Sequence, residues 1–224
     1  MTGTRFTLVD PDAKAPEPEP EPSPQPHGPP AGGPSGARDP ETDRFHARRW
    51  RKHKLLALVI GALGGGLAGY ANTTYGLAIG LPLVAVDPNL FLVVLVVLIA
   101  PVVEEHVKLL ALVFLRSEER ATYTPRRWLV LGAFAGAGFG LAEAALYWQA
   151  IAPTSLAAAN LNLGMRLLLT VPMHALTVTA TGYGYGLSRH DRSIKPLIQG
   201  LAVAILVHAA YNGFQILQAL EGGL

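Results

Sequence analysis

A run of apolar residues between positions 90 and 115 carries acidic and basic side chains in its middle. The segment PVVEEHVKLLALVF contains Glu104, Glu105 and Lys108, and it follows NLFLVVLVVLIA, which has no charge. Two carboxylates beside an amine can act as a general acid and base, or can hold a cation. Each charge at the centre of a bilayer costs about 2.5 to 3.5 kcal/mol on insertion scales. We therefore interpret these residues as functional.

Three further polar residues lie inside other apolar runs, namely Glu143, His174 and His208. Measured from the basic end of each run at 1.5 Å per residue, Glu105 lies about 16 Å deep, the two histidines about 20 Å and Glu143 about 24 Å. The sequence thus predicts that four helices bring polar groups to one layer near the middle of a bilayer.

Two kinds of chemistry fit this set of side chains. His174, His208 and Glu143 could hold one divalent metal such as zinc, with an open position for water and another Glu as general base. Without a metal, two glutamates in different environments could supply an acid and a base. Both routes fit peptide-bond hydrolysis. The sequence contains neither the H-E-x-x-H pattern nor a cysteine nucleophile.

Helical spacing indicates which of these residues share a face. Glu104 and Lys108 are four apart and can pair, whereas Glu105 is rotated by about 100° from Glu104. We expect one carboxylate to face the interior and the other to pair with Lys108 or an adjacent helix. His208 and Asn212 also share a face, and we assign Lys108 and Asn212 supporting roles.

Glycines recur at every fourth position in GAFAGAGFGLAEAALYW, at Gly132, Gly136 and Gly140. Small residues at this spacing allow a second helix to approach closely. We expect this contact to bring Glu143 near its partners, and GYGYG after His174 has the same interpretation.

The composition divides the 224 residues into two parts. Residues 1–44 are Pro-rich, hold eight of the sixteen acidic residues and show no apolar period, which predicts a disordered cytoplasmic tail. This part lacks the basic start and apolar core of a signal peptide. Residues 45–224 form the predicted helical membrane domain. The absence of cysteine excludes disulfides, and the net charge of +2 gives no reason to expect a nucleic-acid partner.

Apolar runs long enough to cross a bilayer predict an all-α, polytopic membrane protein with about five transmembrane helices. The runs cover residues 55–84, 90–115, 127–150, 163–187 and 195–220. The first contains GGG and NTTYG, so it could be one span with a re-entrant piece, or two short spans. Counting it once places every Lys- and Arg-rich loop on the same side. We therefore expect a cytoplasmic N-terminus, an external C-terminus and, from the Ala-, Gly- and Arg-rich composition, a bacterial inner membrane.

Four elements resemble those of the PrsW family of bacterial intramembrane proteases, namely PVVEEHVK, GAGFGLAEAALYW, PMHALTVTATGYGYG and VHAAYNGF. The resemblance covers about residues 90–215. Carried over, the E-E-x-x-K element is Glu104, Glu105 and Lys108, the F-x-x-x-E element is Phe139 and Glu143, and the histidine elements are His174 and His208 with Asn212. An Asn that often follows the third Glu is Ala144 here.

The resemblance implies cleavage of membrane proteins within or near the bilayer, with an anti-sigma factor as substrate in some members, cut in a stress-signalling cascade. The related CAAX-processing and bacteriocin-immunity proteases would place Arg four residues after Glu105, where this chain has Leu109. A proton-coupled transporter or channel is the alternative that buried Glu, His and Lys also allow. An inactive membrane scaffold is the third hypothesis.

Overall fold

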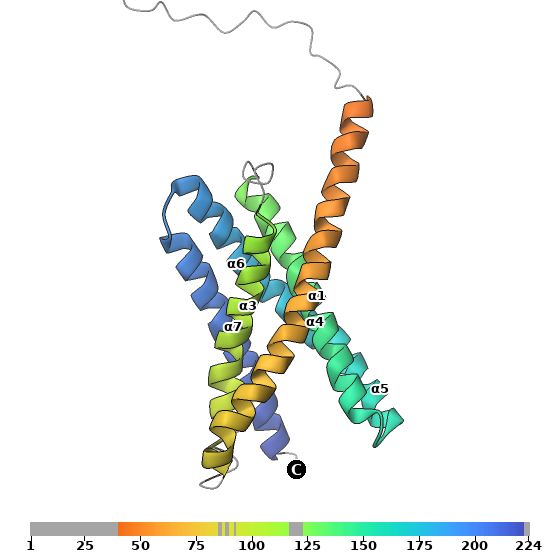
Figure 1. Cartoon of the computed structure of the whole chain (residues 1–224), viewed down its shortest axis with the longest axis vertical. Coiled ribbons are helices and arrows are strands. Elements are labelled where there is room, and N and C mark those ends of the chain that lie inside the picture. The colour runs from red at the N-terminus through yellow and green to blue at the C-terminus, as the bar shows by residue number, and fades with distance from the viewer. Residues whose placement is uncertain (1–39, 85–86, 88–89, 92, 117–122, 222–224) are drawn as a thin grey trace, which may run out of the picture. The chain divides into compact units, whose positions relative to one another are not determined.

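The computed structural model describes residues 40–84, 87, 90–91, 93–116 and 123–221, and this part of the chain contains helices and no strand. The predicted all-α class is confirmed. The helices shown in Figure 1 are α1 (Pro40–Val84), the π-helix η1 (Val93–Ile99) leading into α3 (Ala100–Phe114), α4 (Pro125–Ile151), α5 (Leu156–Met165), the π-helix η3 (Arg166–Thr170), α6 (Val171–Asp191) and α7 (Lys195–Glu221).

Four helical segments are long and apolar enough to cross a membrane: His46–Asn72, Pro125–Ile151, Leu156–Asp191 and Lys195–Gln218. Large apolar side chains on these segments face outward; Leu63 is 70% exposed and Leu168 is 74% exposed. Charged side chains such as Glu105 and Lys108 are buried instead. An apolar exterior around a polar interior is typical of a multi-pass membrane protein.

α1 is one unbroken helix of 45 residues, so the first apolar run contains no re-entrant break. Two glycines of this run, Gly61 and Gly65, lie at a helix contact. A Cβ atom at Gly61 would lie 2.0 Å from the carbonyl oxygen of Ala135 on α4, and one at Gly65 would lie 2.8 Å from that of Phe139. The glycines therefore permit close packing against α4 and do not end the helix.

The fourth predicted span begins earlier in the structure than the sequence suggested. Much of the expected connection APTSLAAANLN is helical, because Ser155 caps the N-terminus of α5 by accepting a hydrogen bond from the Ala158 N–H at 3.2 Å. The Ala-rich run that follows favours a helix. Helical structure therefore extends from Leu156 to Asp191.

The predicted contact through small residues joins α4 to α6. A Cβ atom at Gly132 would lie 2.3 Å from the carbonyl oxygen of Val178, and one at Gly136 would lie 2.2 Å from that of His174. A Cβ atom at Gly182, in the GYGYG stretch, would likewise lie 2.6 Å from the carbonyl oxygen of Trp128. The two backbones are therefore in direct contact on the face that leads to His174, as the sequence predicted.

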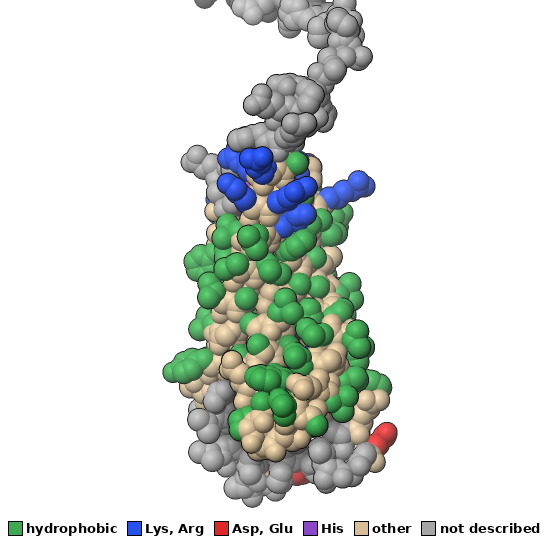
Figure 2. Space-filling view, turned by 90° about the vertical axis from the view of Figure 1, so that its right-hand side faces the viewer, with side chains coloured by type: hydrophobic (Ala, Val, Ile, Leu, Met, Phe, Trp, Pro, Cys, Tyr) green, Lys and Arg blue, Asp and Glu red, His purple; other side chains and the backbone are tan. Residues whose placement is uncertain are grey.

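Basic and aromatic residues gather at one end of the described helices. Figure 2 shows Lys and Arg side chains there, next to a face covered by hydrophobic side chains. At this end the Tyr123 hydroxyl lies 2.5 Å from Nδ1 of His53, and the ring of Trp128 packs edge-on against Tyr185. Residues 1–39 of the predicted disordered tail lie outside the described residues, whereas residues 40–44 belong to α1. The tail and its boundary at residue 44 stay predictions.

Candidate active site

α3 directs three charged side chains into the interior of the helix bundle. Glu104 is 6% exposed, Glu105 0% and Lys108 1%. Nζ of Lys108 lies 2.7 Å from Oε1 of Glu105 and 3.7 Å from Oε2 of Glu104, so the closer partner is Glu105 and not the expected Glu104. The side-chain amide of Asn72 on α1 donates to Oε1 of Glu104 at 2.9 Å. Both carboxylates can be buried because each meets a polar group on a different neighbour of α3.

His208 on α7 is held by a carboxylate in the manner of a metal-binding histidine. Its Nδ1 lies 2.9 Å from Oε1 of Glu105, which also accepts a hydrogen bond from Thr177 at 3.2 Å. Because a carboxylate only accepts, Nδ1 carries the hydrogen and Nε2 keeps its lone pair. That Nε2 atom lies 3.7 Å from Oε2 of Glu104.

His174 on α6 has a partner at each ring nitrogen. Nδ1 lies 2.7 Å from Nζ of Lys108, and Nε2 lies 2.7 Å from Oε2 of Glu143. An ammonium group only donates, so Nδ1 accepts from Lys108 and Nε2–H donates to Glu143. The rings of His174 and His208 stand 5.0 Å apart at 87°. In each ring the lone pair is therefore on the nitrogen that does not donate to Glu105 or Glu143.

Glu143 on α4 lies at the more open edge of this polar cluster. Its side chain is 20% exposed, against 0% for Glu105. Nη1 of Arg166 lies 3.4 Å from Oε1 of Glu143, and the same guanidinium stacks 3.3 Å from the ring centre of Tyr147. Nε of Arg166 also donates to Oδ1 of Asn162 at 3.1 Å. Arg166 is thus fixed on three sides and holds the Glu143 carboxylate beside His174.

Asn212 shares a helix with His208 but points to a backbone carbonyl and not into the cluster. Its amide donates to the carbonyl oxygen of Val96 at 2.9 Å. In a π-helix the carbonyl of residue i accepts from the N–H of residue i+5. For Val96 in η1 that residue is Pro101, which has no N–H to donate. Asn212 therefore replaces a missing backbone donor and fixes α7 against the start of α3.

Three residues of the cluster could hold a metal ion together. Glu104, His174 and His208 each offer a ligand atom, all within 4.8 Å of one another. Oε2 of Glu104 is buried and, among the described residues, has no hydrogen-bond partner. Two imidazoles and a carboxylate are ligands that zinc prefers. The donor set fits a divalent cation.

The formal charges of the cluster also favour a cation. Glu104, Glu105 and Glu143 contribute three negative charges, whereas Lys108 and Arg166 contribute two positive ones. With neutral imidazoles the cluster therefore carries a formal charge of −1 in a buried environment. Such a net charge is costly away from water unless a cation neutralises it.

The model of the PrsW family of intramembrane metalloproteases matches residues 50–223, which is most of the chain. The chain belongs to this family. It is therefore an enzyme, and a protease, of the membrane. No curated protein and no solved structure matches the chain. Membership of the PrsW family favours the protease hypothesis over the transporter, channel and scaffold alternatives.

The structure brings the residues of the PrsW-like elements together, but in an arrangement that could be predicted only in part. Glu104, Glu105, Lys108, Glu143, His174 and His208 form one continuous network of contacts. For the metal, the structure groups Glu104 with the two histidines, whereas the sequence pattern predicts Glu143 as the carboxylate ligand.

Three members of the cluster, Asn72, Arg166 and Thr177, were not predicted from the sequence. Asn72 and Arg166 are polar residues within apolar runs, the same signal that selected the glutamates. Thr177 follows His174 by three positions and so shares its face. Only the packing of α1 and α6 against α3 makes the contacts of Asn72 and Thr177 visible.

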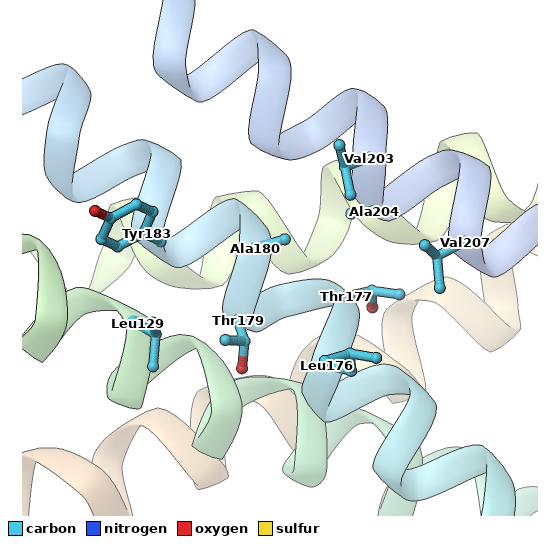
Figure 3. A pocket seen from close by; sticks show the side chains of 9 residues that line it. All are labelled: Leu129, Leu176, Thr177, Thr179, Ala180, Tyr183, Val203, Ala204 and Val207. Carbon is cyan, nitrogen blue, oxygen red and sulfur yellow. The ribbon is translucent and has the colours of Figure 1, made fainter.

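An apolar pocket of about 350 Å³ lies beside the cluster, between α4, α6 and α7. Figure 3 shows Thr177 and Leu176 on its α6 side and Val203, Ala204 and Val207 on α7. Thr177 lines this pocket and also donates to Glu105. Thr177 therefore connects the apolar pocket to the buried carboxylate of this PrsW-family protease.

Proposed function

We propose that this protein is a metal-dependent endopeptidase that cuts membrane-bound proteins at a centre formed by α3, α4, α6 and α7. The observation that carries the proposal is the convergence of Glu104, His174 and His208, within 4.8 Å, in a buried polar layer of a PrsW-family chain. These three residues would hold the ion, for which zinc is our choice. When bound, such an ion supplies Lewis-acid activation of the peptide carbonyl and of water.

The other residues of the cluster have roles that follow from their contacts. Glu105 accepts from Nδ1 of His208 and so fixes the direction of that ring. Glu143, the most exposed of the three glutamates, takes the proton of the attacking water and returns it to the leaving amine nitrogen as the C–N bond breaks. Arg166 holds Glu143 in place for this transfer.

The substrate is a protein with an apolar membrane segment, and an anti-sigma factor cut during stress signalling is the substrate that we favour. The pocket lined by Leu176 and Val207 is apolar, as a lipid-embedded peptide requires, and Thr177 connects it to Glu105. The basic residues at one end of the helices support a cytoplasmic N-terminus in a bacterial inner membrane.

Metal analysis combined with a cleavage assay tests the proposal. Purified protein should contain about one equivalent of zinc, and a chelator should abolish cleavage of a single-span membrane reporter until zinc is restored. His208→Ala should remove both metal and activity. His106→Ala is the matched control, because His106 is exposed and its Nδ1 lies 2.7 Å from the carbonyl oxygen of Val102 in its own helix. Cleavage that continues in metal-free protein would exclude the metal centre.

A further inference from the structure

Lys108 lies where it interferes with the candidate metal ligands, and this position carries an inference that rests on the proposed function. Its Nζ atom lies 2.7 Å from Nδ1 of His174 and 3.7 Å from Oε2 of Glu104. Two of the three candidate ligands are therefore already in contact with one positive charge. Lys108 is 1% exposed, so its amine has no route to solvent without movement.

The hydrogen-bond pattern shows which lone pairs are available. Nε2 of His208 keeps its lone pair because Nδ1 donates to Glu105. His174 donates from Nε2 to Glu143, so its lone pair is on Nδ1, which Lys108 engages. One histidine is ready to bind a cation, and the other is occupied by the ammonium group.

We infer that the Lys108 ammonium occupies the cation position of the Glu104, His174 and His208 triad, and that Lys108 and the metal ion compete for it. A metal bound to Nδ1 of His174 requires Lys108 to leave that nitrogen. Lys108 can keep its ion pair with Glu105, the 2.7 Å partner on the same helix. The lysine therefore preserves the buried site when no ion is bound and lowers the affinity for the ion.

The charge balance of the cluster agrees with this exchange. With Lys108 in place the five charged residues sum to a formal −1, so a divalent ion would leave an excess of +1. Without the lysine charge the sum is −2, which a divalent ion neutralises. Buried charge that is not neutralised is costly, so removing the lysine charge should favour the metal.

Zinc affinity of the full-length protein in detergent, measured by competition with a chromophoric chelator, tests the inference. Lys108→Met and Lys108→Gln should each bind zinc at least about tenfold more tightly than the wild type, because a unit charge a few ångströms away acts strongly in a low dielectric. Lys108→Gln keeps a hydrogen-bond donor for Glu105, so it covers the case in which Lys108→Met does not fold.

Arg166→Gln is the matched control, because it removes one positive charge from the same cluster without touching the triad. The formal charge of the cluster also falls to −2 in this variant, but the guanidinium contacts Glu143 and no ligand of the triad. Its gain in zinc affinity should therefore be less than about threefold, well below that of the Lys108 variants. If wild-type protein binds zinc and the Lys108 variants bind it equally or more weakly, the inference is wrong, while the proposed metal centre still stands. An equal gain in Arg166→Gln also overturns it. If neither wild type nor variants bind zinc, both the inference and the proposed metal centre fall.

Discussion

Replacing Gly136 by alanine perturbs the contact that places His174, and the structure gives the size of the effect. The added Cβ atom would lie 2.2 Å from the carbonyl oxygen of His174, whereas ordinary van der Waals contact begins at 3.4 Å. The backbones of α4 and α6 must therefore separate by about 1.2 Å. Such a shift could stretch the 2.7 Å contact between His174 and Glu143 to about 3.9 Å, beyond hydrogen-bonding range.

Gly66→Ala is the control, because a Cβ atom there meets nothing within 4 Å. Both glycines lie within helices, where alanine alone is favoured by about 1 kcal/mol. Overpacking at Gly136 opposes that gain by about 1 to 3 kcal/mol. We therefore expect Gly136→Ala to unfold at a lower temperature than Gly66→Ala. A misplacement near 1 Å should also reduce cleavage by about a hundredfold.

Thermal unfolding in detergent and the cleavage rate of a membrane reporter measure the two effects. Gly132→Ala refines the test. Its Cβ atom would lie 2.3 Å from the carbonyl oxygen of Val178, a clash as close as that at Gly136 but one helical turn beyond His174. It should lose stability to a similar degree and activity to a smaller one. The reasoning is refuted if Gly136→Ala matches Gly66→Ala in both measurements.

Four further experiments test other contacts and predictions. Glu105→Gln should reduce cleavage by about 10- to 100-fold while the protein stays inserted, because the ring of His208 loses its orienting carboxylate; a wild-type rate would contradict this. Asn212→Leu and Asn212→Asp should lower the unfolding temperature but keep the metal content, since both remove the donor to Val96; loss of metal would show that Asn212 is a ligand. Deleting residues 1–44 should leave insertion and cleavage intact, as an immunoblot and the reporter assay can show. A reporter fused after Leu224 should be external, and cytoplasmic activity would disprove the five-crossing topology.

Helix positions could be predicted from the sequence because a hydrocarbon core requires long apolar runs. The predicted runs 127–150 and 195–220 agree closely with α4 and α7. The run 163–187 was too short, because alanines and the Ser155 cap favour helix without being strongly apolar. The run 55–84 looked broken because glycine has a low helix propensity in general, whereas Gly61 and Gly65 face a neighbouring backbone and the helix continues through them.

The members of the candidate site could largely be predicted, but their partners could not. Polar residues in apolar runs stand out, so Glu143 and His174 were identified from the sequence. Which nitrogen of His174 meets which group depends on helix rotation and crossing, which spacing within a single helix does not define. For the same reason Lys108 was paired with Glu104, although its closer carboxylate is Glu105.

The glycine contacts and the buried charges depend on each other. A charge in the bilayer interior is tolerated where it meets partners that replace water, and side chains reach across helices only if the backbones are close. At Gly136 the close approach of α4 to α6 occurs at His174 itself, which links Lys108 on α3 to Glu143 on α4. The glycines thus set the distances on which the charge network depends, so damage to the packing should reach the chemistry through His174.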